Sequence, residues 1–237
     1  MSARPKNCYA IIPARSGSKR IPGKNIKAFA GRPMIEYAIE TAAKSDLFDE
    51  ILVSTDSQEV QEIAIAAGAS APFLRPEALS DDLTTTSAVL VHALNALGLA
   101  NSGGIACCIY STTPFVLPQD LHDGLKILAS TGAASVFAAA EFAAPVHRAF
   151  RQSKDGVLNL MWPEYRDTRT QDLPRAFHDA GQFYWVEIEN FLKNPALLTP
   201  TSRAVEIPRW RAHDLDTPDD WRRAELVFTA LREDFTL

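Results

Sequence analysis

Short apolar runs alternate along this chain with longer segments in which apolar residues recur every three or four positions. The short runs occupy residues 8–12, 50–56, 104–110, 134–140, 180–186 and 204–207. Segments with the helical period occupy residues 34–42, 58–67, 87–97 and 218–232, and another begins at Leu117. Runs this short are typical of buried strands. Their alternation with helices predicts a parallel sheet with right-handed crossovers.

Local signals mark several helix boundaries. Pro33 suits the first turn of the helix that contains Met34. Gly68 is expected to stop the helix that ends at Ala67. The threonine run 84–86 can cap the helix that starts at Ser87.

The alternation weakens between residues 141 and about 175. Only short strand-like pieces, 146–151 and 157–162, surround the polar stretch 163–169. Long irregular segments in compact enzymes often serve as lids or subunit contacts. We therefore predict a small inserted flap here, with a role in dimerisation or in covering a site.

A basic loop follows the first apolar run. The run stops at Pro13, and Arg15, Lys19, Arg20 and Lys24 then place four positive charges among glycine and serine residues. Ligands of open α/β sheets bind beyond the carboxyl ends of strands. Small residues let backbone N–H groups approach a ligand, and the cations neutralise a polyanion. The loop predicts a triphosphate site; the alternative is a solvated basic turn.

Two common phosphate-binding motifs do not fit this loop. Gly17 and Gly23 enclose five residues where a Walker A motif has four, and Asn25 stands where that motif needs Ser or Thr. No G-x-G-x-x-G occurs, so a dinucleotide-binding fold has no support.

Size and composition narrow the class of protein. The 237 residues and 26.0 kDa predict a single domain over residues 1–237 with a sizeable core. A net charge of −5 argues against general nucleic-acid binding. Three cysteines, two of them adjacent, are expected to be reduced core residues. With no signal peptide and no apolar run of membrane-spanning length, we expect a cytoplasmic protein without membrane contact.

A pair of carboxylates near the carboxyl end is the second candidate for chemistry. Asp214 and Asp216 are separated by one residue, so in extended backbone their side chains point to the same side. Two hard oxygen ligands suit Mg²⁺, which keeps several waters and bridges protein carboxylates to substrate phosphates. The alternative is that Asp216 or Thr217 only caps the helix that starts at Pro218.

An ordered set of motifs resembles the CMP-sialic acid synthetase (acylneuraminate cytidylyltransferase) family. The stretches that carry this resemblance are 11–25, 54–56, 74–76, 80–82 and 214–217. Within the family, the pseudaminic acid branch is the most similar at 107–111, 162–164, 169–173 and 177–185. The similarity runs from about Tyr9 to the final helix.

The resemblance implies a fold and a reaction. The fold would be a three-layer αβα sandwich of the nucleotide-diphospho-sugar transferase type, with a mostly parallel, Rossmann-like sheet. The anomeric hydroxyl of a nine-carbon 2-keto acid sugar would attack the α-phosphate of CTP and release pyrophosphate, supplying a surface glycan such as that of flagellin. Mg²⁺ or Mn²⁺ would assist. Members are commonly homodimers whose flap reaches across the interface.

The resemblance also implies roles for residues at the nucleotide. Arg15, Lys19 and Lys24 would hold the phosphates, Arg75 would read the pyrimidine, and the role of Arg20 is open because the sialic acid branch is usually uncharged there. The metal ligands would be Asp214 and Asp216. The implied nucleotide-binding set is Ala14, Arg15, Ser16, Gly17, Ser18, Lys19, Asn25, Arg75, Ser80 and Asp81. The general base stays open between Asp214, a metal-bound water and His213.

For the sugar, the implied set is Tyr110, Ser111, Thr112, Arg169, Gln182, Phe183 and Tyr184. Arg169 would bind the sugar carboxylate, or else form a surface ion pair with Glu164 or Asp167. Phe183 would line the pocket or pack in the core. Tyr110 stands where the sialic acid branch has glutamine, which favours pseudaminic acid over N-acetylneuraminic acid. Legionaminic acid, and a non-catalytic CTP-binding module, stay open as alternatives.

Overall fold

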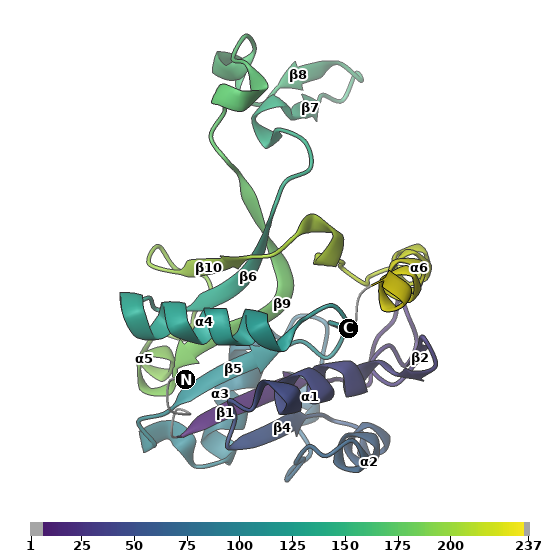
Figure 1. Cartoon of the computed structure of the whole chain (residues 1–237), viewed down its shortest axis with the longest axis vertical. Helices are drawn as coiled ribbons and strands as arrows, with labels where there is room; N and C mark the ends of the chain where they lie inside the picture. The colour runs from purple at the N-terminus through teal and green to yellow at the C-terminus, as the bar shows by residue number, and fades with distance from the viewer. Residues whose placement is uncertain (1–6, 235–237) are drawn as a thin grey trace.

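A six-stranded sheet forms the centre of the computed structural model, which describes residues 7–234 (Figure 1). Its strands, in spatial order, are β10 (Arg203–Glu206), β6 (Val136–Glu141), β9 (Phe177–Glu187), β5 (Ile105–Ile109), β1 (Cys8–Pro13) and β4 (Glu50–Ser54). Only β9 runs antiparallel to its neighbours, β5 and β6; the other pairings are parallel. The prediction of a mostly parallel sheet is confirmed.

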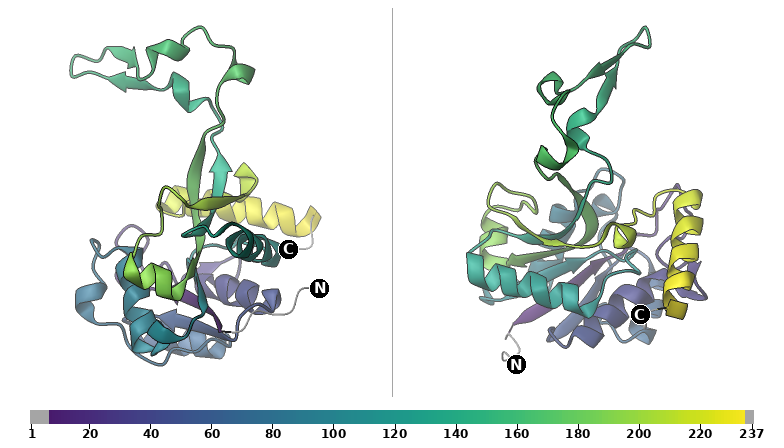
Figure 2. Two further views of the ribbon diagram at one scale, coloured as in Figure 1. Left: turned by 90° about the vertical axis from the view of Figure 1, so that its left-hand side faces the viewer. Right: turned by 45° about the horizontal axis from the view of Figure 1, so that its top comes forward.

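Helices cover both faces of this sheet, so the three-layer αβα prediction is also confirmed (Figures 1 and 2). One face packs against α1 (Met34–Ser45), α2 (Gln58–Ala66) and α4 (Pro118–Thr131). The other packs against α3 (Thr86–Ala96) and α5 (Ile188–Lys193). The last helix, α6 (Pro218–Asp234), contributes Trp221 and Phe228 to a separate aromatic cluster with Phe29 and Tyr37.

Strand alternation explains why the chain needs two apolar layers. In β1, Cys8, Ala10 and Ile12 face one layer while Ile11 faces the other. In β5, Cys107 and Cys108 divide in the same way, and burial raises the pKa of the Cys108 thiol to about 12. All three cysteines are buried and none forms a disulfide bond, as expected of core thiols.

Several boundaries differ from the sequence-based expectation. Pro33 lies just before α1 and belongs to a two-residue strand, β3 (Arg32–Pro33), which pairs with β2 (Ala28–Phe29). The short helix α5 was not predicted. Thr85 caps α3 by accepting a hydrogen bond from the Ala88 amide at 3.2 Å, as the threonine run indicated.

A flap of residues 142–176 leaves the sheet between β6 and β9 and stands away from the body (Figures 1 and 2). It contains a small hairpin of β7 (Phe150–Gln152) and β8 (Leu158–Leu160). At its base, Arg175 pairs with Glu141 at 3.0 Å and with Glu206 at 2.5 Å. Within residues 7–234 the helices are too short or too polar to cross a membrane.

We predict that Gly124→Ala destabilises the protein, although this change usually stabilises a helix by about 1 kcal/mol. A Cβ at Gly124 would lie 2.6 Å from Cδ1 and 2.8 Å from Nε1 of the buried Trp185 ring. Overpacking of this kind costs about 1–3 kcal/mol. The helix gain offsets about 1 kcal/mol of this cost, so chemical denaturation should give a net loss of up to about 2 kcal/mol in the free energy of unfolding.

The matched control is Ser130→Ala on the exposed side of the same helix. It should change the free energy of unfolding by less than about 0.5 kcal/mol. A gain in stability for Gly124→Ala would contradict the packing described here.

Candidate active site

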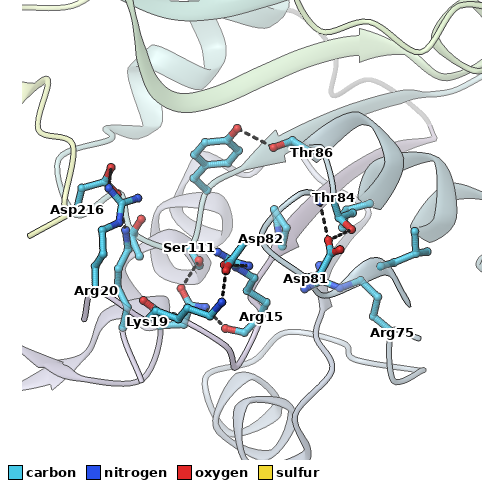
Figure 3. Close-up of a pocket in the computed structure, with 18 residues that line it drawn as sticks. Arg15, Lys19, Arg20, Arg75, Asp81, Asp82, Thr84, Thr86, Ser111 and Asp216 are labelled. Atoms are coloured by element: carbon cyan, nitrogen blue, oxygen red, sulfur yellow. Dashed lines mark hydrogen bonds and ion pairs between the residues drawn. The ribbon is translucent and has the colours of Figure 1, made fainter. Parts of the chain in front are cut away.

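A pocket of about 500 Å³ opens beyond the carboxyl ends of β1 and β5 (Figure 3). All four cations of the predicted basic loop line it: Arg15, Lys19, Arg20 and Lys24. Asp81, Asp82 and Asp216 line it as well and give the pocket three carboxylates. The loop therefore lines a concave site, although its Lys19 and Arg20 side chains stay exposed to solvent.

The basic loop is held in place by an internal hydrogen bond and by hydrogen bonds to two neighbouring segments. Asp56, which follows β4, accepts bonds from the Ser16 amide at 2.8 Å and the Ser16 hydroxyl at 2.7 Å. Asn25 donates to the Arg15 carbonyl at 2.7 Å and accepts from the Ser111 hydroxyl at 2.7 Å. Asn25 thus joins the loop after β1 to the loop after β5: its amide nitrogen bonds the first loop and its amide oxygen the second.

Each cation of the loop has an acidic or carbonyl partner. Arg15 Nη1 lies 2.7 Å and Lys19 Nζ 2.6 Å from the Asp82 carboxylate. A hydrogen bond from Lys19, and to a smaller extent one from Arg15, holds the pKa of the Asp82 carboxyl below its usual range. On the other side, Arg20 Nη1 lies 2.7 Å from Asp216 (Figure 3).

Lys24 connects the loop to the carboxyl-terminal segment. Its ammonium donates to the Leu215 carbonyl at 2.6 Å and lies 3.5 Å from Asp216 Oδ1. Leu215 itself is buried in the aromatic cluster beneath α6. The positions of Lys24 and Asp216 are therefore coupled.

Arg75 is a buried cation on the far side of the pocket, with a side chain only 2% exposed. Its Nε donates to the Ser80 hydroxyl at 3.1 Å, and its Nη2 lies 4.0 Å from Asp56. Burial lowers the pKa of this guanidinium. A fixed, desolvated guanidinium of this kind can read the hydrogen-bonding edge of a planar base.

The predicted nucleotide residues separate into two groups. Those that line the pocket are Arg15, Ser18, Lys19, Asn25, Arg75 and Asp81. Outside its lining are Ala14, Ser16, Gly17 and Ser80, which shape the loops behind it. Asp81 Oδ1 accepts bonds from the amides of Leu83 and Thr84, so its carboxylate is used within its own loop. Its neighbour Asp82, which belongs to the stretch 80–82 but was assigned no role from the sequence, faces the cations instead.

In the segment before α6, the residues that cap the helix are not those proposed to bind the metal ion. Thr217 and Asp220 bond reciprocally at the start of α6: the Thr217 amide donates to Asp220 at 2.9 Å, and the Asp220 amide donates to the Thr217 hydroxyl at 3.2 Å. Capping thus falls to Thr217, and the Asp216 carboxylate is left to face the pocket. Although Asp214 is an exposed residue, desolvation of its carboxyl group and then repulsion from Asp216 raise its pKa.

Two adjacent carboxylates that repel each other fit a hard divalent cation. Mg²⁺ takes one or two protein carboxylates and fills its remaining positions with water and phosphate oxygens. Across residues 7–234, no group of three or more His, Cys, Asp or Glu side chains is arranged to hold a metal ion by itself. Two carboxylates alone would leave most positions around such a cation to water and to phosphate oxygens.

A buried ion pair positions this segment. Arg211 Nη2 donates to Asp120 Oδ1 at 2.9 Å, and Nη1 bonds the other carboxylate oxygen. The two side chains are only 8% and 7% exposed. Gln182 donates to the Arg211 carbonyl at 2.6 Å. Because Arg211 shortly precedes Asp214, these bonds fix where the carboxylates emerge from the core.

The residues predicted for the sugar are only partly brought together. Tyr110, Ser111 and Thr112 line the pocket, and the Tyr110 hydroxyl shares a 2.8 Å hydrogen bond with Thr86. Tyr184 lies behind Tyr110, with ring centroids 5.5 Å apart. Its hydroxyl donates to Asp179 at 2.7 Å.

Gln182, Phe183 and Arg169 lie outside the pocket lining. Gln182 is buried against the Arg211 carbonyl, and Phe183 is fully buried in the core on the opposite face of β9 from Tyr184. Arg169 is on the flap and pairs with Asp172 at 2.8 Å rather than with Glu164 or Asp167.

Residues 9–184 match the cytidylyltransferase family profile. The chain is 37% identical over 224 residues to the pseudaminic acid cytidylyltransferase of Campylobacter jejuni, covering 94% of this chain and 97% of that one. It is 31% identical to the CMP-N,N'-diacetyllegionaminic acid synthase of Legionella pneumophila, with the same two coverages.

A solved structure shares the fold at low sequence identity. It is a CMP:2-keto-3-deoxy-manno-octonic acid synthetase complexed with CTP, with a TM-score of 0.70 and 17% identity. The match covers 95% of this chain and 99% of the other. The αβα architecture with its mostly parallel sheet is therefore shared with that synthetase.

We predict that Asp120→Asn lowers the free energy of unfolding by about 3–5 kcal/mol, because it leaves the Arg211 guanidinium buried without a counter-charge. Asparagine keeps the shape and an oxygen that can still accept the Leu117 amide bond, so the loss reports on the ion pair. Chemical denaturation measures it. Asp123→Asn, which alters a solvent-side contact of the same helix, should cost less than about 0.5 kcal/mol; equal losses would refute the assignment.

Proposed function

This chain belongs to the cytidylyltransferase family, and we propose that it transfers CMP from CTP to pseudaminic acid with release of pyrophosphate. The observation that carries the chemistry is the pocket itself, in which one loop presents four cations opposite Asp216. The substrate rests on the similarity to the pseudaminic acid cytidylyltransferase of C. jejuni. We also propose that the enzyme acts in the cytoplasm, where CTP is made.

In the proposed reaction, the anomeric hydroxyl oxygen attacks the α-phosphorus of CTP. The bond to the bridging oxygen breaks, pyrophosphate carries away the electron pair, and the hydroxyl proton passes to a base. The protein contributes mainly position and charge neutralisation. Arg15, Lys19 and Lys24 would hold the phosphates, and the buried Arg75 would hold the cytosine. Arg20, paired with Asp216, would adjust the charge beside the proposed metal ligands.

Asp214, or a water held beside it, is better suited than His213 to accept the proton. Desolvation and repulsion from Asp216 raise the pKa of the Asp214 carboxyl, but a metal ion held there would lower it again, so with the ion present the water would be the base. The His213 ring is held by a 2.7 Å contact with the Trp210 carbonyl and packs on Phe115 at 4.7 Å between centroids.

Mg²⁺ or Mn²⁺ would be held by Asp214 and Asp216. When bound, the ion would neutralise charge on the phosphate oxygens and make the α-phosphorus a better electrophile. The repulsion between the two carboxylates supports this assignment, because a cation relieves it.

The sugar would lie against Tyr110, Ser111 and Thr112. The hydroxyl of Tyr110 is engaged by Thr86, so the pocket receives mainly the aromatic ring. An apolar surface favours a deoxygenated sugar over one that carries hydroxyls at the same place. This supports pseudaminic acid over N-acetylneuraminic acid.

We further propose a homodimer formed through the flap. Large apolar side chains are exposed on the flap and at the adjoining start of β9: Phe142, Phe150, Val157, Leu158, Met161 and Phe177. Exposed apolar side chains gathered on one element are typical of a protein interface. In such a dimer the exposed Arg169 of the flap would reach the sugar carboxylate in the other subunit's pocket.

The function is tested by pyrophosphate release from CTP and Mg²⁺ with pseudaminic, legionaminic and N-acetylneuraminic acids offered separately. We expect release with pseudaminic acid at a kcat/KM well above that for the other two. A preference for another of these sugars would keep the transfer and replace the substrate. Binding of CTP without release for any of them would favour the non-catalytic module.

Asp216→Asn should reduce turnover by about 10²-fold, whereas Asp219→Asn, at the exposed start of α6, should not.

The dimer is tested by Leu158→Glu at the tip of the flap hairpin. Leu158 is 59% exposed, so the charge should leave the fold intact while it breaks the apolar contact. Sedimentation at micromolar concentration should show a dimer for the natural sequence and a monomer for the variant. Leu226→Glu, on the exposed face of α6, is the matched control and should stay dimeric. A monomer for the natural sequence would remove this proposal and the assignment of Arg169.

A further inference from the structure

Asp82 is the acidic residue that most directly competes for the cations of the pocket. It lies on the bend between the short 3-10 turn Glu77–Leu79 and helix α3. Its carboxylate lies 2.7 Å from Arg15 Nη1 and 2.6 Å from Lys19 Nζ, and Figure 3 shows all three side chains meeting within the pocket. In the part of the chain that the structure describes, these are its only side-chain partners.

The same two cations have a second use in the proposed function, on which this inference rests. A phosphate seated on Arg15 and Lys19 would lie beside the Asp82 carboxylate, and like charges at such a distance repel. The two arrangements therefore exclude each other unless Asp82 turns away. We propose that Asp82 takes the place of a substrate phosphate on Arg15 and Lys19, is exchanged for it when CTP binds, and thereby sets the affinity for the nucleotide.

The loop around Asp82 is built so that this side chain can move while its neighbours stay. Ser80 is fixed by bonds to Arg75 and to the Pro76 carbonyl, both at 3.1 Å. Thr84 is fixed to Asp81 through its amide at 2.7 Å and its hydroxyl at 2.6 Å. The Asp82 side chain, between these two anchors, is 42% exposed. A rotation about its own side-chain bonds releases both cations without disturbing either anchor.

The solvent exposure of the two ion pairs determines how strongly Asp82 competes with a phosphate for Arg15 and Lys19. The side chains of Lys19 and Arg15 are 82% and 36% exposed, so each ion pair is weakened by solvent. One carboxylate is thus a modest competitor for a triphosphate, which carries several charges. It is a more effective competitor for a nucleotide product with a single phosphate. Displacing Asp82 costs each ligand the same free energy, so CTP, with its additional phosphates, still binds while release of such a product is assisted.

The experiment compares Asp82→Asn with the natural sequence in steady-state pyrophosphate release. We expect KM for CTP to fall by about threefold to tenfold, the scale of one or two weak ion pairs, with kcat retained. Inhibition by CMP should strengthen, whereas inhibition by cytidine, which has no phosphate, should not change. The effect on CTP should shrink as salt is raised. Asp82→Glu, which keeps the charge, should stay close to the natural sequence.

Glu77→Gln is the matched control, because it removes one negative charge from an exposed position in the preceding turn. It should leave KM for CTP unchanged. An unchanged or raised KM for Asp82→Asn would overturn the inference, as would an equal fall for Glu77→Gln. If the natural protein releases no pyrophosphate, the proposed function fails. Calorimetric binding of CTP to the same variants then tests Asp82 by itself.

Discussion

The buried ion pair between Asp120 and Arg211 is the interaction on which the site depends most. Asp120 also accepts the Leu117 amide at the start of α4, so one carboxylate both begins a helix and holds a distant guanidinium. The chain continues from Arg211 to Leu215, whose carbonyl accepts a hydrogen bond from the Lys24 ammonium. A core interaction therefore sets the distance between the basic loop and the carboxylates, although neither Asp120 nor Arg211 lines the pocket.

The sequence predicted the local half of this arrangement well. A short apolar run identifies a buried strand because burial on both faces leaves no polar positions, and the basic loop follows where β1 ends. What it missed are contacts made across the fold. Asp56 and Asp82 look like ordinary loop acids, and only the crossovers that bring their loops beside the basic loop give them their roles. The sequence feature that pointed to Asp82 was its position next to Asp81, which belongs to the predicted nucleotide-binding set.

Strand geometry also explains why three consecutive residues of β9 could not all reach the sugar. Successive side chains of a strand point to opposite faces, so Phe183 and Tyr184 cannot share a pocket. Phe183 accordingly lies in the core with Trp185, and Tyr184 packs behind Tyr110. This much was available from periodicity alone. The use of Gln182 to hold the Arg211 carbonyl was not, because it depends on a segment far along the chain.

Charge balance connects these features. The cations of the basic loop would repel one another if left alone, and each is held by an acid or a carbonyl of another segment: Asp82, Asp216 or Leu215. Such pairing keeps the loop ordered and directed at the pocket at little cost, because partly exposed pairs are weak and exchange readily. A ligand that carries several negative charges can replace several of these partners at once, whereas a singly charged ligand cannot. The same weak pairs that order the loop would thus give way to the several charges of the proposed substrate CTP.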